Sequence, residues 1–301
     1  MKNIFIRLIF SLVPVKSWRK SFFSWLYSKL FISNYYEIMK FFNHIVTKKL
    51  AIEQSKSVTT IFLGSSHMDY TCNPEYISPS SFNLGSRSQD LVSSFFLYSY
   101  YRNRLSDLKH IILAISIFSP GFCLSKSSES YMGDIFCAVY KSDYPDHTYN
   151  KKLSFLHKQK NIKNINNYNG FCYPSKISKS EVNLSKRVGA HLRENNRTPD
   201  TLEFLNKLIL LKKEDKRHIT LVYMPVHSQY REMASMMSGK SGDELLQKIT
   251  TLATSLSVPV INLYSCFADS DFYDFDHLNP YGAQKFSLLM KECLEKENEN
   301  Y

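Results

Sequence analysis

A serine, a histidine and an aspartate far apart in the chain have the residue types and spacing of a nucleophilic site. Ser66 follows the apolar run 60–63 and Gly64, while Asp274 and His277 lie more than two hundred residues later. A serine hydroxyl becomes a nucleophile when a histidine takes its proton, and a partner must fix the tautomer of that histidine. Because Asp274 and His277 are three residues apart, one turn of backbone can bring the carboxylate to Nδ1–H and leave Nε2 for Ser66. The three residues together indicate acyl transfer through a serine.

Both motifs also have a structural interpretation. The first, G-S-S-H, is compatible with a polar turn that closes a strand, and Asp274, Asp276 and His277 are compatible with a polar loop that caps the last helix. Asp271 and Asp276 are rival acids, but neither has the three-residue spacing to His277. Three carboxylates near a histidine also raise the question of a metal, but further ligands at helical or strand spacing are missing. We therefore expect no metal and no cofactor.

Apolar and β-branched runs alternate with helical patterns five times. The expected strands are 58–63, 81–85, 110–116, 218–225 and 258–263, and the expected helices are 88–104, 184–194, 199–213, 241–256 and 279–297. This alternation predicts an α/β fold, a three-layer α/β/α sandwich around a flavodoxin-like parallel sheet of about five strands. Open α/β sheets bind ligands at the carboxyl ends of their strands, and Ser66, Asp274 and His277 all follow strands.

The two motifs resemble those of the SGNH (GDSL-like) hydrolase superfamily. G-S-S-H near the start and D-x-x-H-L-N-x-x-G-A near the end are similar to its first and last blocks, especially in short bacterial members found with cell-surface polysaccharide biosynthesis. The resemblance spans 59–294, with a poorly matched middle. It implies that Ser66 is the nucleophile and that Asp274 and His277 complete the triad. The first block usually reads G-D-S, and Ser65 replaces that aspartate at a position outside the triad.

The same resemblance implies an oxyanion hole built from backbone donors. Its expected donors are the N–H groups of Ser66 and of Gly85, which ends the second strand. The superfamily often adds an asparagine after the third strand, where this chain reads S-I-F-S-P-G over 116–121. Ser116, Ser119 and Asn83 remain alternative third donors.

Several polar residues in these motifs, or at the same sheet edge, are candidates for substrate contact. They are His67, Asn83, Ser119, His227 and Asn279. His227 is also a rival base, and its alternative interpretation is a loop histidine without a role. The stretch 124–183, rich in Ser, Lys, Asn and Tyr, predicts either a substrate-shaping lid or a disordered surface loop.

The positive charge of the chain is concentrated in its first sixty residues. The formal net charge is +11, and residues 1–60 hold ten Lys or Arg against Glu37 and Glu53, which gives +8 of that total. Mixed with aromatic residues, this pattern predicts one or two amphipathic helices that contact an anionic membrane through 1–50. A helical pair packed on the domain is the alternative. The apolar stretch 1–15 is too short to span a membrane, and it lacks the cleavage site of a signal peptide.

We divide the chain into a basic helical segment, 1–55, and an SGNH-like domain, 56–301, with the insertion at 124–183. Patterns typical of helix-turn-helix, zinc-finger or RNP domains are absent, so nucleic acid is not an expected partner. Six scattered cysteines without a C-x-x-C pair fit a reducing compartment. The expected location is the bacterial cytoplasm, peripheral at the inner membrane.

The resulting functional hypothesis is a serine esterase or O-acyltransferase. By resemblance, its partners are an acyl donor and a carbohydrate. The carbohydrate is a surface polysaccharide or its lipid-linked precursor, and either one carries the O-acetyl group. The alternative is a non-catalytic SGNH-like module that binds glycan or acts as a scaffold for polysaccharide assembly. A third hypothesis is a lipase-like enzyme or thioesterase, which would need a deep apolar tunnel rather than an open polar cleft.

Overall fold

The computed structural model describes residues 37–55, 57–144, 169–172, 182–197 and 200–299. Within them, five parallel strands form one sheet in the order β2-β1-β3-β4-β5. The strands are β1 (Thr60–Leu63), β2 (Ser81–Asn83), β3 (His110–Ile115), β4 (His218–Tyr223) and β5 (Val260–Asn262). This order confirms the predicted flavodoxin-like α/β sheet, with each strand within a few residues of its expected bounds.

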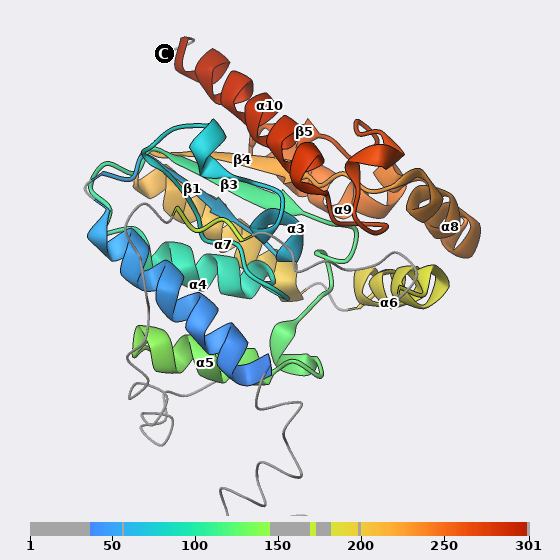
Figure 1. Ribbon diagram of the computed structural model, residues 1–301, viewed down its shortest axis with the longest axis horizontal. Helices are drawn as coiled ribbons and strands as arrows, with labels where there is room; N and C mark the ends of the chain where they lie inside the picture. Colours follow the sequence, from blue (N-terminus) through green and yellow to red (C-terminus); the bar gives the residue numbers. More distant parts are fainter. Residues whose placement is uncertain (1–36, 56, 145–168, 173–181, 198–199, 300–301) are drawn as a thin grey trace, which may run out of the picture. The chain divides into compact units, whose positions relative to one another are not determined.

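Helices cover both faces of this sheet (Figure 1). The bounds are α3 (Ser66–Asp69), α4 (Leu91–Tyr101), α5 (Tyr131–Tyr140), α6 (Leu184–Asn195), α7 (Asp200–Glu214), α8 (Ser228–Ser238), α9 (Gly242–Ser255) and α10 (Pro280–Glu299). In the view of Figure 1, α10 lies above the sheet, and α4 and α7 lie below it. The predicted three-layer arrangement is therefore confirmed.

The alternation of side chains along each strand explains the layers. Phe62, Ile112 and Val222 point to the same face and pack with Phe286 and Met290 of α10 in one buried cluster. On the other face, the hydroxyl of Tyr223 lies 2.7 Å from that of Thr250, which places α9 against β4 there. The central strand β3 is buried along its whole length, as expected for parallel strands covered on both sides.

The turn that follows β1 depends on a glycine. Gly64 has a φ of +145°, and a Cβ atom at this position would lie 2.6 Å from the Cβ of Ala114 on β3. A larger residue would meet both a backbone strain and a steric clash. Gly64 therefore allows the chain to leave the sheet directly beside β3 and to enter α3.

Besides the four-residue helix α3, two longer helices were not predicted from the sequence. Residues 131–140 fall in the stretch expected to be an irregular insertion, yet they form α5, in which all residues except Tyr131 and Asp134 are buried. Residues 228–238, for which no helix is predicted, form α8. Residues 145–168 and 173–181 of the insertion lie outside the described residues, so the choice between a lid and a surface loop stays a prediction.

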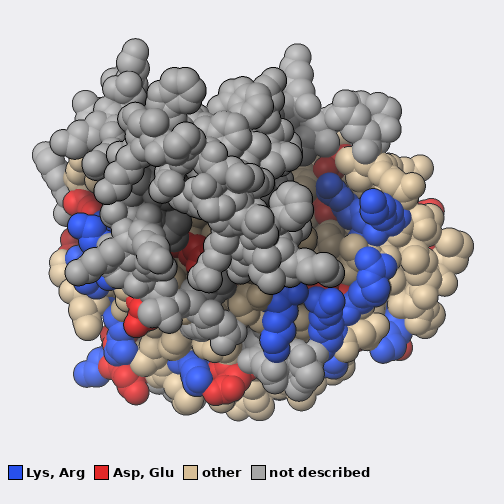
Figure 2. All heavy atoms as spheres, turned by 90° about the horizontal axis from the view of Figure 1, so that it is seen from below, with Lys and Arg blue, Asp and Glu red and all other residues tan. Residues whose placement is uncertain are grey.

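The N-terminal prediction lies mostly outside the described residues, since 1–36 are not among them. A helix covers 37–54, and contacts divide the chain into two units, 1–44 and 45–301. Among the described residues, no helix combines the length and apolar character that crossing a bilayer requires. Figure 2 shows one face of the molecule, where Lys and Arg side chains form several groups with Asp and Glu among them.

Candidate active site

Ser66 stands at the first position of a short helix, directly after the buried strand β1. Ser65 caps this helix, and its carbonyl accepts hydrogen bonds from the backbone N–H groups of Met68 and Asp69 at 2.9 and 3.1 Å. As the first helical residue, Ser66 has no intrahelical acceptor for its own N–H. The local sequence G-S-S thus presents a half-buried hydroxyl and a backbone donor at the carboxyl edge of the sheet.

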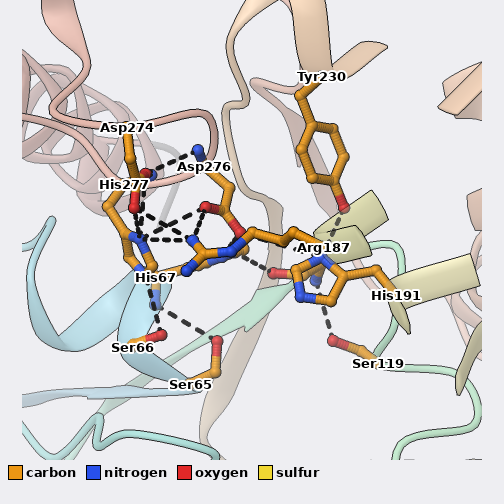
Figure 3. A network of polar contacts seen from close by, with 11 residues as sticks. Ser65, Ser66, His67, Ser119, Arg187, His191, Tyr230, Asp274, Asp276 and His277 are labelled. Atoms are coloured by element: carbon orange, nitrogen blue, oxygen red, sulfur yellow. Dashed lines mark hydrogen bonds and ion pairs between the residues drawn. The ribbon is translucent and has the colours of Figure 1, made fainter. Parts of the chain in front are cut away.

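The three predicted triad residues form one continuous chain of hydrogen bonds (Figure 3). Ser66 Oγ lies 3.0 Å from Nε2 of His277, and Nδ1 of His277 lies 2.9 Å from Oδ2 of Asp274. A carboxylate only accepts hydrogen bonds, so Nδ1 carries the proton and Nε2 accepts the proton of Ser66. Residues that are 211 positions apart in the sequence are brought into the geometry of an activated serine.

The loop around Asp274 holds its carboxylate in place. Oδ1 accepts the backbone N–H groups of His277 at 2.7 Å and Asp276 at 3.0 Å. Burial acts to raise the pKa of Asp274, but the hydrogen bond and charge of His277 outweigh it and hold that pKa below its ordinary value. Asp274 is therefore ionised at neutral pH and orients the imidazole.

Electrostatics make His277 a stronger base than an isolated imidazole. Burial lowers its pKa, while the charge of Asp276 and the hydrogen bond to Asp274 act in the opposite direction and leave the pKa raised. By contrast, burial dominates at His67 and His191, whose pKa values are lowered, for His191 to about 4. Three neighbouring histidines thus have separate roles, and His277 is the one suited to take up a proton near neutral pH.

His67, Asp276 and His277 also have the composition of a small metal site. Their ligand atoms all lie within 4.8 Å of one another. However, the guanidinium of Arg187 contacts Asp276, and Nε2 of His67 lies 3.2 Å from the same carboxylate. Nε2 of His277 faces Ser66. A cation here would stand beside a fixed positive charge, so the residues present fit proton chemistry better than metal binding.

A cleft of about 400 Å³ opens beside Ser66 and His277. Arg187 and His191, four residues apart on α6, and Phe118 and Phe122 after β3 contribute to its walls. The ring centroids of Phe118 and His191 are 4.6 Å apart. The cleft therefore combines aromatic faces with charged and hydroxyl groups directly beside the nucleophile.

Two of the expected residues near β2 serve the fold instead. The side-chain amide of Asn83 is fully buried and donates to the carbonyls of Met68 and Cys72 at 2.9 and 2.7 Å. Its oxygen accepts the backbone N–H of Gly85 at 2.8 Å. The expectation that Asn83 contacts substrate is therefore wrong, and the expected oxyanion donor of Gly85 is already engaged within the β2 turn.

The other expected substrate contacts are also mostly structural. His227 is buried and caps α8, and its Nδ1 accepts the N–H of Gln229 at 3.2 Å. Asn279 caps α10 through Gly282 N–H at 3.0 Å. These two expectations are corrected, because both side chains are committed to helix starts. The hydroxyl of Ser119 accepts the backbone N–H of Ser116 at 2.9 Å, and only His67 lines the cleft itself.

Sequence reasoning missed Arg187, His191 and Ser88. Arg187 and His191 are spaced by four in L-S-K-R-V-G-A-H, a signal that both occupy one face of a helix. Ser88 lines the cleft, and its φ of +55° is a strained backbone conformation of the kind often found at functional sites. No short motif marks Ser88, whose role depends on the path of the chain.

Comparisons with known proteins complete the description of the site. No protein-family profile matches the chain, and no curated protein matches its sequence. Its fold is similar to a structure described as an acylhydrolase from Bacteroides fragilis (10% identity, 81% of this chain and 92% of that one, TM-score 0.44). It is also similar to a GDSL-like lipase from Bacteroides thetaiotaomicron (11%, 85% and 99%, TM-score 0.43). A carbohydrate acetylesterase family member from Sinorhizobium meliloti is a further match (10%, 79% and 98%, TM-score 0.39).

Of these three descriptions, only that of the GDSL-like lipase names the superfamily whose motifs the sequence resembles. At 10–11% identity and TM-scores below 0.5, the similarity assigns no activity to this chain. Its chemistry follows from its own residues.

Proposed function

We propose that the chain is a serine esterase or O-acyltransferase of the SGNH kind. The observation that carries the proposal is the hydrogen-bond chain from Ser66 through His277 to Asp274, with links of 3.0 and 2.9 Å. Side chains from two ends of the sequence meet at the sheet edge with each donor facing its acceptor. This arrangement matches what an activated serine needs.

The reaction proceeds through an acyl-enzyme. Ser66 Oγ attacks the ester carbonyl as its proton moves to Nε2 of His277, and the tetrahedral intermediate collapses when His277 returns that proton to the leaving alcohol. The acyl group is then an ester of Ser66. Water or a sugar hydroxyl, deprotonated by His277, attacks this ester and releases either the free acid or a new acyl ester, together with regenerated Ser66.

The negative charge that develops on the carbonyl oxygen requires donors near Ser66. The backbone N–H of Ser66 itself is suitable, because it belongs to the first residue of α3 and points out of the helix start. A preorganised donor of this kind lowers the barrier by about 3 kcal/mol. With the Gly85 N–H engaged by Asn83, we assign the first oxyanion donor to Ser66 alone.

The cleft favours a short acyl group on a carbohydrate. Its lining mixes hydroxyl groups with charges of both signs, and Arg197 pairs with Glu194 there at 3.1 Å. Paired charges and hydroxyls can exchange hydrogen bonds with a polyhydroxylated substrate, while the half-buried Phe122 offers a ring for a pyranose. A long acyl chain would need an extended apolar wall instead. We therefore propose an O-acetyl group on a surface polysaccharide or its lipid-linked precursor as the substrate.

Ester hydrolysis tests this proposal. Purified wild type should hydrolyse p-nitrophenyl acetate much faster than p-nitrophenyl palmitate, and Ser66→Ala should lose this activity. Ser255→Ala, an exposed serine on α9, is the matched control and should retain it. A folded wild type that hydrolyses neither ester would contradict the enzyme proposal and favour a glycan-binding module. Faster turnover of the palmitate would favour the lipase-like alternative.

Acyl transfer and hydrolysis differ in the acceptor. A transferase should convert p-nitrophenyl acetate and an added oligosaccharide into an acetylated oligosaccharide detectable by mass spectrometry, whereas an esterase should release only acetate. We also propose that contacts through 1–50 hold the protein at the cytoplasmic face of an anionic membrane, where a lipid-linked acceptor would lie. Co-sedimentation of the full chain with phosphatidylglycerol vesicles, but not with phosphatidylcholine vesicles, is the expected result.

A further inference from the structure

A second buried carboxylate lies beside the histidine of the triad. Asp276 is 3% exposed, and its Oδ1 lies 3.4 Å from Nδ1 of His277, a little farther than the oxygens of Asp274. Its Oδ2 lies 3.2 Å from Nε2 of His67. Figure 3 shows Asp276 between the two imidazoles, with Arg187 against it. The acyl-transfer mechanism described above assigns no role to this carboxylate.

His67 connects Asp276 to the sheet. Because a carboxylate only accepts, Nε2 of His67 carries the proton toward Asp276, and Nδ1 accepts the hydroxyl proton of Ser116 at 2.6 Å. Ser116 follows β3 directly, so the acid loop is attached to the rigid end of the central strand. A neutral His67 satisfies both contacts, and its buried position favours that state.

Arg187 is shared between the two carboxylates. Its Nη1 lies 3.1 Å from Oδ2 of Asp274, contacts Oδ1 of Asp276, and lies 3.5 Å from Nδ1 of His277. Two carboxylates and one guanidinium leave one negative charge in excess while His277 is neutral. When His277 takes up the proton of Ser66, the cluster becomes neutral, so its charges stabilise the imidazolium that forms during acyl transfer.

The groups that face His277 come from four parts of the chain. Its own loop supplies Asp274 and Asp276. Helix α3 supplies Ser66 and His67, and Tyr70, directly after α3, has its ring centroid 5.6 Å from that of His277. Helix α6 supplies Arg187 and His191, and Tyr230 of α8 reaches the cluster through His191 at 2.6 Å. Of these groups, Asp276 and Arg187 carry fixed charge without being members of the triad.

We propose that Asp276 is a second, positioning carboxylate for His277 and that Arg187 sets how strongly the two carboxylates act on the imidazole. This proposal rests on the proposed esterase or acyltransferase function and adds two residues to its machinery. Asp276 acts through its contact with His277, and Arg187, which also contributes to the wall of the cleft, acts on the imidazole through the two carboxylates. Their effects on His277 must therefore have opposite signs.

The pH profile of kcat/KM for p-nitrophenyl acetate tests the opposite signs. Asp276→Asn removes negative charge, so His277 should lose its proton more easily. The acid limb of the kcat/KM profile should therefore move to lower pH by about one pH unit, and the plateau value of kcat/KM should fall about tenfold. Arg187→Gln removes positive charge and should move the limb to higher pH. Arg187→Lys should keep the limb near its wild-type position. Asp107→Asn and Arg193→Gln, both exposed and the latter on α6, are the matched controls.

The proposal is overturned if the folded Asp276→Asn and Arg187→Gln variants keep the acid limb in place or move it in the same direction. The two residues would then have a structural role only.

The histidine signals of the otherwise unaltered Ser66→Ala protein provide a second test by nuclear magnetic resonance. The proposal requires the Nε2–H tautomer of neutral His67 at pH 7, and a cationic His67 or the Nδ1–H tautomer would contradict it. Because this measurement needs no turnover, it separates failure of the inference from failure of the proposed function.

Discussion

At the residue scale, the site depends on which atom of each imidazole carries a proton. Asp274 receives two backbone N–H groups on Oδ1 and His277 Nδ1–H on Oδ2, so one carboxylate sets both the loop and the tautomer. The i, i+3 spacing of Asp274 and His277 was sufficient to predict this contact. The same spacing argument excluded Asp276 as a partner of His277. The main partners of Asp276, His67 and Arg187, come from distant segments that only the fold brings together, so its role could not be predicted from the sequence.

Replacing the orienting carboxylate tests the role of Asp274. Asp274→Asn can keep an oxygen for the backbone N–H groups, so we expect a folded protein, but its amide cannot hold His277 in the required tautomer. The expected loss in kcat/KM is about 10⁴-fold. Steady-state kinetics with p-nitrophenyl acetate measure it, with circular dichroism as the check on folding. A folded variant within about threefold of wild type would show that Asp274 does not orient the base.

The pH dependence of the wild type follows from the environment of His277. Its burial lowers the pKa, while the charge of Asp276 and the bond to Asp274 raise it, and the net result is above the ordinary value of 6.5. Only the neutral imidazole accepts the proton of Ser66, so kcat/KM should rise with pH and reach half its plateau above pH 6.5. A midpoint well below pH 6.5 would mean that a different group is the base.

At the element scale, a buried lysine secures the helix that carries the nucleophile. Lys48 is 1% exposed, and its Nζ lies 2.7 Å from Oδ1 of Asp69 in α3 and 3.1 Å from the carbonyl of Asn83. It also contacts the carbonyl of Gly85. One side chain thus ties α3 to the turn after β2. Sequence reasoning found a basic N-terminal region but could not separate this lysine from its solvated neighbours.

Lys48→Met should be strongly destabilising, because it leaves the carboxylate of Asp69 buried without this partner. The expected loss in free energy of unfolding is about 3–5 kcal/mol, measured by urea denaturation. Lys49→Met is the matched control. It removes a partly exposed pair with Glu53 on the same helix and should cost less than about 1 kcal/mol. Equal losses for the two variants would contradict the assigned role of Lys48.

The elements that could be predicted are those with a strong apolar pattern. Strands β1, β3 and β4 are runs of β-branched and apolar residues, as is typical of parallel strands covered on both faces. The missed helix α8 has only Tyr230 and Ala234 buried, and α5 lies in a stretch whose surrounding composition suggested a loop. Their helical state is determined mainly by packing on other elements, which a local pattern does not show.

At the scale of the whole molecule, the buried histidines couple stability to pH. Burial lowers the pKa of His67, and it lowers the pKa of His191 to about 4, while unfolded histidines keep their ordinary value of 6.5. Between pH 6.5 and 4 the unfolded chain therefore binds more protons at these two positions, and acidification favours unfolding. His277 acts in the opposite direction, since its raised pKa contributes stability below pH 6.5 that is lost at higher pH.

Among the three histidines of the site, two have lowered pKa values and one has a raised value, so their combined contribution to the free energy of unfolding should fall as the pH drops from 7 to 5. Urea denaturation at both values measures the change. His191→Gln removes one of the two groups and should flatten this dependence, whereas a variant as acid-sensitive as wild type would exclude His191 as a source. The variant lacks the ring contact of His191 with Phe118 at both pH values. The packing cost of the substitution therefore cancels in the difference between the free energies of unfolding at pH 7 and pH 5.

The most direct test of the whole account is the position of the covalent adduct formed with a fluorophosphonate ester probe. Trypsin should release residues 57–87 as one peptide, because no Lys or Arg lies between Lys56 and Arg87. The account predicts a single adduct that fragmentation spectra place on Ser66, absent in Ser66→Ala and retained in Ser255→Ala. An adduct on another residue, or a folded wild-type protein that forms none, would contradict the assignment of Ser66 as the nucleophile.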